Sequence, residues 1–138
     1  MADTIRKVDY FYIETANKPG EAAKVLGVLR DAGVNLLAFS GFPQGRKAQI
    51  DFIPENTADF KTAAKKAGLK LSLRKTGFLI QGEDRPGAIA EITGKLAAAN
   101  INITACDGIS AGEGRFGAIL WVKGTDVGKA ARVLGATS

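Results

Sequence analysis

Histidine is absent from this 138-residue chain, and cysteine, tryptophan and methionine each occur once. The missing histidine excludes imidazole acid–base catalysis, and the lone cysteine excludes an internal disulfide. Together, the two observations exclude Cys/His zinc sites. No apolar run approaches the roughly 18 residues of a membrane-spanning helix, and residues 1–8 lack the apolar stretch of a signal peptide. We therefore expect a cytoplasmic protein without metal, cofactor or membrane contact.

Acidic residues are missing from the stretch between Lys61 and Lys75, which carries six basic side chains. The whole chain sums to 19 − 14 = +5, so the other residues sum to 13 − 14 = −1. A solvated helix face accounts for such a basic strip as well as a binding surface does. The net charge alone therefore does not indicate nucleic acid.

The chain contains an internal repeat with a period of 67 residues. When Asp9–Leu71 is aligned with Thr76–Ser138 without a gap, 16 of 63 positions are identical. The pairs that composition explains least are Pro19-Gly20 with Pro86-Gly87 and Asn35 with Asn102. We therefore divide the chain into a first copy, residues 1–75, and a second copy, residues 76–138.

Each copy shows the pattern of a strand, a helix, two strands and a second helix. Strands are predicted at residues 10–15, 34–42 and 48–53 of the first copy and at 77–82, 101–109 and 116–122 of the second. Helices are predicted after Pro19 and Pro86 and around Phe60–Ala67 and Val127–Leu134. A fourth strand, Leu69–Leu73, is expected in the first copy alone, because three residues follow the last helix of the second.

This order of elements is the split βαβ, or ferredoxin-like, arrangement, with two helices on one face of an antiparallel sheet. The sequence therefore predicts an α+β fold of two tandem βαββαβ units packed side by side, the second unit lacking its last strand. The strand at Gly77–Gly82 would then be an edge, which proteins usually cover. We expect Thr4–Val8, or another subunit, to pair with it.

The repeated loops Asn17-Lys-Pro-Gly20 and Asp84-Arg-Pro-Gly87 connect the first strand of each copy to its first helix. Proline suits the first helical turn, which explains this residue without any function. The N–H groups of Gly20, Glu21 and Ala22, or of Gly87, Ala88 and Ile89, would be free donors for a carboxylate. Asn17 or Asp84 could accept hydrogen bonds from an ammonium group. The sequence thus indicates a site for a zwitterion.

A second repeated polar residue, Asn35 or Asn102, stands at the apolar start of the second strand of each copy. Asparagine is depleted in strands, and a buried amide needs partners at both ends. Such a side chain can tie down the preceding turn or contact a ligand, and the sequence leaves both interpretations open.

The loop, the amphipathic helix after it and the strings Gly33-Val-Asn-Leu36 and Asn100-Ile-Asn-Ile103 resemble, in this order and twice, the ACT domain, a regulatory ligand-binding module. ACT domains typically pair side by side and bind an amino acid at the junction. The resemblance implies a homodimer, or a complex with a regulated enzyme or transcription factor. It nominates two sites: Asn17, Gly20 and Glu21 with Asn102 and Ile103, and Asp84, Gly87, Ala88 and Ile89 with Asn35 and Leu36.

The two nominated sites differ in charge. Asp84 is a carboxylate and Asn17 is not, and a carboxylate is the stronger partner for an ammonium. The sequence therefore favours the site around Asp84–Ile89, with the first-copy site as the alternative.

Two other classes of function are weaker. The RNA-recognition motif shares this order of elements, but Arg115-Phe116 lacks the expected glycine between them and the first copy has no stacking aromatic there. We do not expect nucleic-acid binding. Catalysis would depend on residues such as Cys106, which as a lone cysteine in a strand is typically a small apolar side chain. We therefore do not expect an enzyme.

Overall fold

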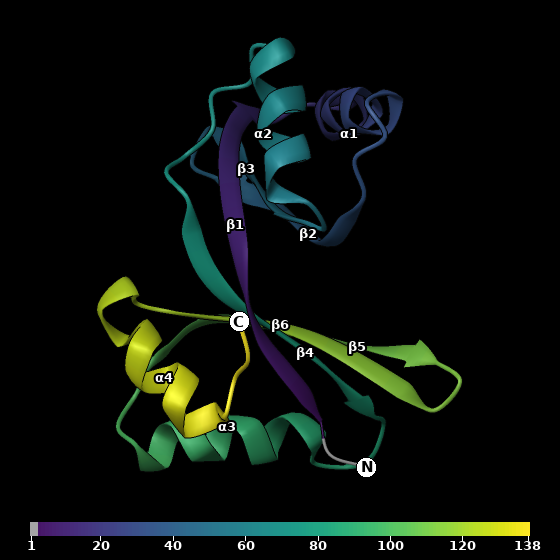
Figure 1. The fold of residues 1–138 in the computed structure, drawn as a ribbon. Coiled ribbons are helices and arrows are strands. Elements are labelled where there is room, and N and C mark those ends of the chain that lie inside the picture. Colours follow the sequence, from purple (N-terminus) through teal and green to yellow (C-terminus); the bar gives the residue numbers. More distant parts are fainter. Residues whose placement is uncertain (1–2) are drawn as a thin grey trace. The chain divides into compact units, whose positions relative to one another are not determined.

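The computed structural model describes residues 3–138 and is built from strands and short helices (Figure 1). The elements are β1 (Thr4–Ala16), α1 (Glu21–Asp31), β2 (Leu36–Gln44), β3 (Lys47–Pro54), α2 (Thr57–Lys66), β4 (Lys75–Glu83), α3 (Ala88–Ala98), β5 (Ile103–Gly112), β6 (Arg115–Val122), a 3₁₀ turn η1 (Gly124–Asp126) and α4 (Val127–Leu134). The predicted α+β fold with two βαββα repeats is confirmed. Each predicted helix and each of the six shared strands is present within a few residues of its expected bounds.

The chain forms two structural units. The first unit is Asp9–Lys75, and the second unit combines Thr76–Ser138 with the described part of Met1–Val8. The break near residue 75 agrees with the period of the repeat. The initial residues, which the sequence assigns to the first copy, lie with the second.

The first unit has the strand order β2-β3-β1. Strand β3 pairs antiparallel with both neighbours, so that Phe52 stands opposite Phe11 on β1 and Phe39 on β2. Alternate residues of β1 and β3 face α1 and α2 and bury their apolar side chains against Leu29 and Phe60. Phe52 and Phe60 are fully buried. This small core fixes the loop between β1 and α1.

The second unit repeats this layout with the order β1-β4-β6-β5. Phe78 on β4 stands opposite Leu120 on β6, and both side chains are fully buried. Helices α3 and α4 contact each other and contribute Leu96 and Ala130 to the same core. The two units thus use one plan with different core residues.

The first residues of β1 cover the edge of β4, as the sequence predicts. β1 is the hydrogen-bonded neighbour of β4, and Ile5 belongs to the buried core of the second unit. The C-terminus joins on the other side of β1: the Lys7 N–H donates to the Thr137 carbonyl at 2.8 Å, and the Thr137 N–H donates to the Ile5 carbonyl at 3.0 Å. Thr4–Val8 therefore takes the place of the missing fourth strand.

The predicted fourth strand of the first unit, Leu69–Leu73, is wrong. The Ser72 N–H donates to the Tyr12 carbonyl at 2.9 Å, but the Tyr12 N–H donates to the Ser72 hydroxyl oxygen at 3.0 Å instead of to a carbonyl. Because a side chain takes half of the backbone pair, the ladder does not propagate. Leu73 is 87% exposed.

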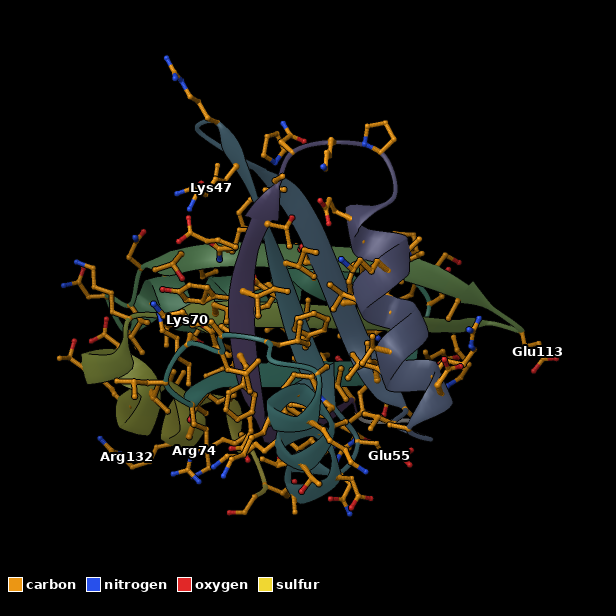
Figure 2. The ribbon with its side chains drawn as sticks, turned by 90° about the horizontal axis from the view of Figure 1, so that it is seen from above. Lys47, Glu55, Lys70, Arg74, Glu113 and Arg132 are labelled. Atoms are coloured by element: carbon orange, nitrogen blue, oxygen red, sulfur yellow. The ribbon has the colours of Figure 1, made fainter. Side chains whose placement is uncertain are left out.

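The ungapped alignment is also wrong across the third strand of each unit. Gly41 on β2 stands opposite Ile50, whereas its equivalent Gly108 on β5 stands opposite Ala118, so the offset there is 118 − 50 = 68. The hairpin between β5 and β6 holds the extra residue. Its turn residue Glu113 lies at the tip of this hairpin with a positive φ of 55° (Figure 2).

Candidate functional site

The loop before the first helix of each unit ends on a glycine with left-handed backbone. Gly20 has a φ of 90° and Gly87 a φ of 81°, a conformation that favours glycine over any residue with a Cβ. Each glycine carbonyl accepts the first helical hydrogen bond, from Lys24 or Glu91 at 3.0 Å. The two loops thus turn into their helices in the same way, and neither helix has a side-chain cap.

Each loop forms one wall of a cleft, and the edge strand of the same unit forms the other. The Asn17 cleft has a volume of about 400 Å³, and the Asp84 cleft has a volume of about 360 Å³. The Asn17 cleft is lined by Thr15, Ala16, Asn17, Lys18, Glu21, Ala22, Phe39, Gly41, Phe42, Pro43, Ala48, Gln49 and Ile50. The Asp84 cleft is lined by Asp84, Arg85, Gly87, Ala88, Ile89, Ala90, Gly108, Ile109, Ser110 and Phe116. Most of the second set are repeat equivalents of the first.

The polar end of the Asn17 cleft holds hydrogen-bonding groups that have no partner among residues 3–138. No hydrogen bond of the Asn17 amide is formed within residues 3–138. Lys18 Nζ lies 3.7 Å from Glu21 Oε1, and the Lys18 side chain is largely exposed. The N–H groups of Glu21 and Ala22 in the first turn find no backbone acceptor in the described chain. Both signs of charge and free donors thus meet at this loop.

The apolar end of the Asn17 cleft lies on β2 and β3. Phe39, Gly41 and Pro43 alternate onto the face of the sheet that α1 covers, opposite Phe52, Ile50 and Ala48. The Phe39 ring is 42% exposed and packs edge-on against Phe52 with the ring centroids 5.9 Å apart. By the same alternation, Phe42 directs its side chain to the opposite face.

At the polar end of the Asp84 cleft, the charged side chains already form hydrogen bonds with nearby side chains of the protein. The Ser110 hydroxyl donates to Asp84 Oδ2 at 2.9 Å. Arg85 donates to both carboxylate oxygens of Asp3, at 3.1 and 3.2 Å, and to Glu91 at 2.9 Å. The hydrogen bonds to Asp3 and Glu91 raise the pKa of Arg85 above its ordinary value. The Arg85 guanidinium is therefore already paired with two carboxylates of the protein. The Ala88 N–H, expected to be free, donates to the Arg85 carbonyl at 3.3 Å.

The strings at Asn35 and Asn102 do not line either cleft. The Asn35 amide nitrogen donates to Glu55 Oε2 at 3.3 Å, and the Glu55 N–H donates back to the Asn35 carbonyl at 3.0 Å. Asn35 thus links the turn after α1 to Glu55, the residue that follows β3 and is labelled in Figure 2. Asn102 is exposed, and Leu36 and Ile103 are half-buried against their cores.

Cys106, the thiol of the chain, is half-buried on β5. Burial, followed by the nearby Asp107 carboxylate, raises the pKa of the Cys106 thiol, which disfavours the reactive thiolate. No group of three or more acidic or cysteine side chains that could hold a metal occurs in the described part of the chain. No helix among residues 3–138 is long and apolar enough to cross a membrane.

Sequence reasoning reached the loops but missed the facing strand. Asp84, Ala88 and Ile89 line one cleft and Asn17 and Glu21 the other, as nominated. The residues it missed are Phe39, Gly41, Pro43, Gly108 and Ser110. A signal for two of them was available, because Gly41 and Gly108 are an identical pair of the repeat.

Comparison with solved structures identifies several chains of the same fold. A protein from Bacteroides thetaiotaomicron has a TM-score of 0.81 at 20% identity, covering 95% of this chain and 88% of its own. The ligand-free regulatory subunit of aspartate kinase from Thermus thermophilus has a TM-score of 0.66 at 17% identity, covering 98% and 95%. That from Thermus flavus has a TM-score of 0.59 at 18% identity, covering 97% and 94%. At these identities the likeness shows the fold alone.

Comparison by sequence finds one family model that matches part of the chain. No curated protein sequence matches the chain. The family model of the ACT domain matches residues 77–137, which hold the Asp84 loop and most of the second unit. The first unit repeats the same order of elements and the same loop geometry. Residues 77–137 therefore match the ACT domain, a regulatory ligand-binding module, and the first unit shares their order of elements.

Proposed function

We propose that this protein is a non-catalytic, cytoplasmic regulatory subunit that binds an amino acid at the loops of its ACT units. One observation carries the proposal: the same loop forms the wall of a cleft in both units, between the start of a helix and an edge strand. A volume near 400 Å³ lies in the range of small-molecule sites, about 300–1,000 Å³. The repeat of this arrangement supports a binding site over an incidental surface feature.

The chemistry of each loop suits a zwitterion. A ligand carboxylate would accept hydrogen bonds from the first N–H groups of α1 or α3, which also carry the positive end of the helix dipole. A ligand ammonium would donate to the Asn17 amide oxygen or to the Asp84 carboxylate. The proposed contacts are Asn17, Gly20 and Glu21 in one cleft, and Asp84, Gly87, Ala88 and Ile89 in the other.

The second strings complete the proposed sites through an adjoining ACT domain. In this proposal Asn102 and Ile103 reach the ligand of the Asn17 cleft, and Asn35 and Leu36 reach that of the Asp84 cleft. The partner is a second copy of the chain, or a regulated enzyme or transcription factor. The structurally similar Thermus proteins, named as regulatory subunits of an aspartate kinase, support an enzyme as the regulated partner.

A thermal-shift screen of the full chain against the twenty amino acids and the common nucleotides tests this function. A ligand at about 100 times its Kd adds about 2.7 kcal/mol to the free energy of unfolding, which is easily measured. We expect at least one amino acid to raise the Tm, and Asn17→Ala or Asp84→Ala to remove that shift.

Asp107→Ala is the matched control, because this exposed carboxylate belongs to the second unit but does not line its cleft. It should leave the shift unchanged. The proposed function fails if no amino acid raises the Tm, or if neither loop variant alters the shift that one produces.

A further inference from the structure

The two clefts differ at one pair of equivalent positions. Ala22 and Ile89 are the second residues of α1 and α3, and Gly41 and Gly108 face them from β2 and β5. In the Asp84 cleft the Ile89 Cδ1 lies so close over Gly108 that a Cβ added there would collide with it. In the Asn17 cleft a Cβ added at Gly41 would meet, among residues 3–138, the Phe39 ring alone, at 3.9 Å. The space that an isoleucine side chain fills in one cleft is therefore open in the other.

The walls around this open space are apolar. Ala22, Phe39, Pro43, Ala48 and Ile50 surround it, and the Phe39 ring keeps 42% of its surface exposed. Among residues 3–138, Phe39 and Phe42 are exposed large apolar side chains that line the Asn17 cleft, and Ile109 is one that lines the Asp84 cleft. An exposed apolar side chain that borders a cleft marks a surface that a ligand can cover. An apolar group placed over Gly41 would contact this ring and remove it from water.

The charged groups of the Asn17 cleft lie at its other end. Lys18 and Glu21 belong to the loop and the first helical turn, and they pair with each other at 3.7 Å. A ligand side chain that carried a charge into the space over Gly41 would lose water without gaining a partner, which is unfavourable. The cleft thus separates a polar end for a zwitterionic head from an apolar end for a side chain.

We infer that the Asn17 cleft takes an amino acid with an apolar side chain, which occupies over Gly41 the space that Ile89 occupies over Gly108. This inference rests on the proposed amino-acid-binding function and names the class of its ligand. Because Ile89 fills the space over Gly108, the Asp84 cleft, although its volume is about 360 Å³, has no equivalent room there for a ligand side chain. The expected stoichiometry is one bound amino acid per chain.

Calorimetric titration of the full chain with L-isoleucine, L-leucine and L-phenylalanine, and separately with L-aspartate and L-lysine, tests the ligand class. At least one apolar amino acid should bind with a stoichiometry of one, and the charged ones should not. Ala22→Ile should weaken this binding by about tenfold or more, because it fills the space with a side chain of the protein. Phe39→Ala should also weaken it, through loss of the apolar wall.

Ala23→Ile is the matched control, since Ala23 is an exposed neighbour on the same helix that does not line the cleft. It should leave the affinity within about twofold, because the new side chain lies outside the cleft. Binding of charged amino acids alone, equal affinity in Ala22→Ile or Phe39→Ala, or two sites per wild-type chain would overturn the inference while amino-acid binding stands. Absence of binding by all amino acids would instead defeat the proposed function.

Discussion

At the scale of single residues, Gly82 is a position where the backbone touches its neighbours directly. A Cβ there would lie 2.9 Å from the Phe116 ring and would collide with the Asp3 carboxylate that holds Arg85. We expect Gly82→Ala to lower the free energy of unfolding by about 1–3 kcal/mol, the usual range for overpacking. Urea denaturation of the full chain measures this loss.

Gly94→Ala is the control with the opposite sign. Gly94 lies within α3, is exposed and has no atom within 4 Å of an added Cβ. Alanine there should raise the free energy of unfolding by about 0.5–1 kcal/mol, because glycine disfavours a helix interior. Equal effects of the two substitutions would contradict the close contact at Gly82.

Cys106 has a thiol whose pKa differs between the folded and the unfolded chain. Burial, and then Asp107, raise the pKa of its thiol, so the unfolded chain releases this proton first as pH rises. The associated stability is complete below the ordinary thiol pKa and is lost as pH increases through the raised value. Iodoacetamide should therefore alkylate the native chain more slowly than the urea-unfolded chain above about pH 8, near the ordinary thiol pKa. Equal rates would refute the shift.

Residue types alone explain why the loops were predictable and their facing wall was not. The prolines of Pro19-Gly20 and Pro86-Gly87 indicate the start of a helix from local sequence alone. The role of Phe39 depends on strand register, because alternation decides which side chains face the helices. The contact of Ile89 with Gly108 is a property of packing between two elements, and no local pattern encodes it.

At the scale of elements, β1 is a strand that contributes to the sheets of both units. Its 13 residues supply the fourth strand of the second unit at one end and the first strand of the first unit at the other. Ile5 is buried with Phe78 and Ile80 in the second core. We expect Ile5→Ala to cost about 2–5 kcal/mol, as for other buried isoleucines.

Lys7→Ala is the comparison variant for Ile5→Ala, because the Lys7 side chain is exposed while its backbone makes the bond to Thr137. Its effect should stay within about 0.5 kcal/mol. Hydrogen exchange should show the Ile5→Ala loss as weakened protection of the β4 amides. Unchanged protection of β4 would mean that the first residues of β1 do not complete this sheet.

The sequence could locate these elements but not all of their pairings. The duplication predicted that the first strand of the second copy would be an edge, and the edge rule led to Thr4–Val8 as the segment that covers it. The same reasoning failed at Leu69–Leu73, because an apolar alternation does not reveal that the Ser72 hydroxyl replaces a backbone acceptor. The one-residue offset in the third strands arises in a hairpin, where an extra residue leaves no periodic trace.

At the scale of the whole molecule, the excess positive charge is concentrated in one segment of the chain, residues 61–75. Lys61, Lys65 and Lys66 are exposed residues of α2. Lys70 and Arg74, labelled in Figure 2, belong to the segment after this helix. Phe116 and Trp121, the aromatic residues of β6, are buried, so this strand offers no stacking platform for bases.

We therefore expect no specific RNA binding by the full chain. In fluorescence anisotropy, any association with single-stranded RNA at low salt should vanish between about 50 and 200 mM salt, in the manner of phosphate contacts alone. It should also disappear in Lys61→Glu/Lys65→Glu/Lys66→Glu. Salt-resistant, sequence-dependent binding would revive the nucleic-acid alternative.

The central claim is that an amino acid binds at the start of a first helix, between the loop and the facing strand. Backbone NMR of the full chain during titration with the amino acid that gives the largest thermal shift tests this most directly. The account predicts shifts concentrated on the amides of Gly20, Glu21 and Ala22 and on Gly41, with Gly108 little affected. Shifts confined to other residues, or no shifts at saturating ligand, would contradict it.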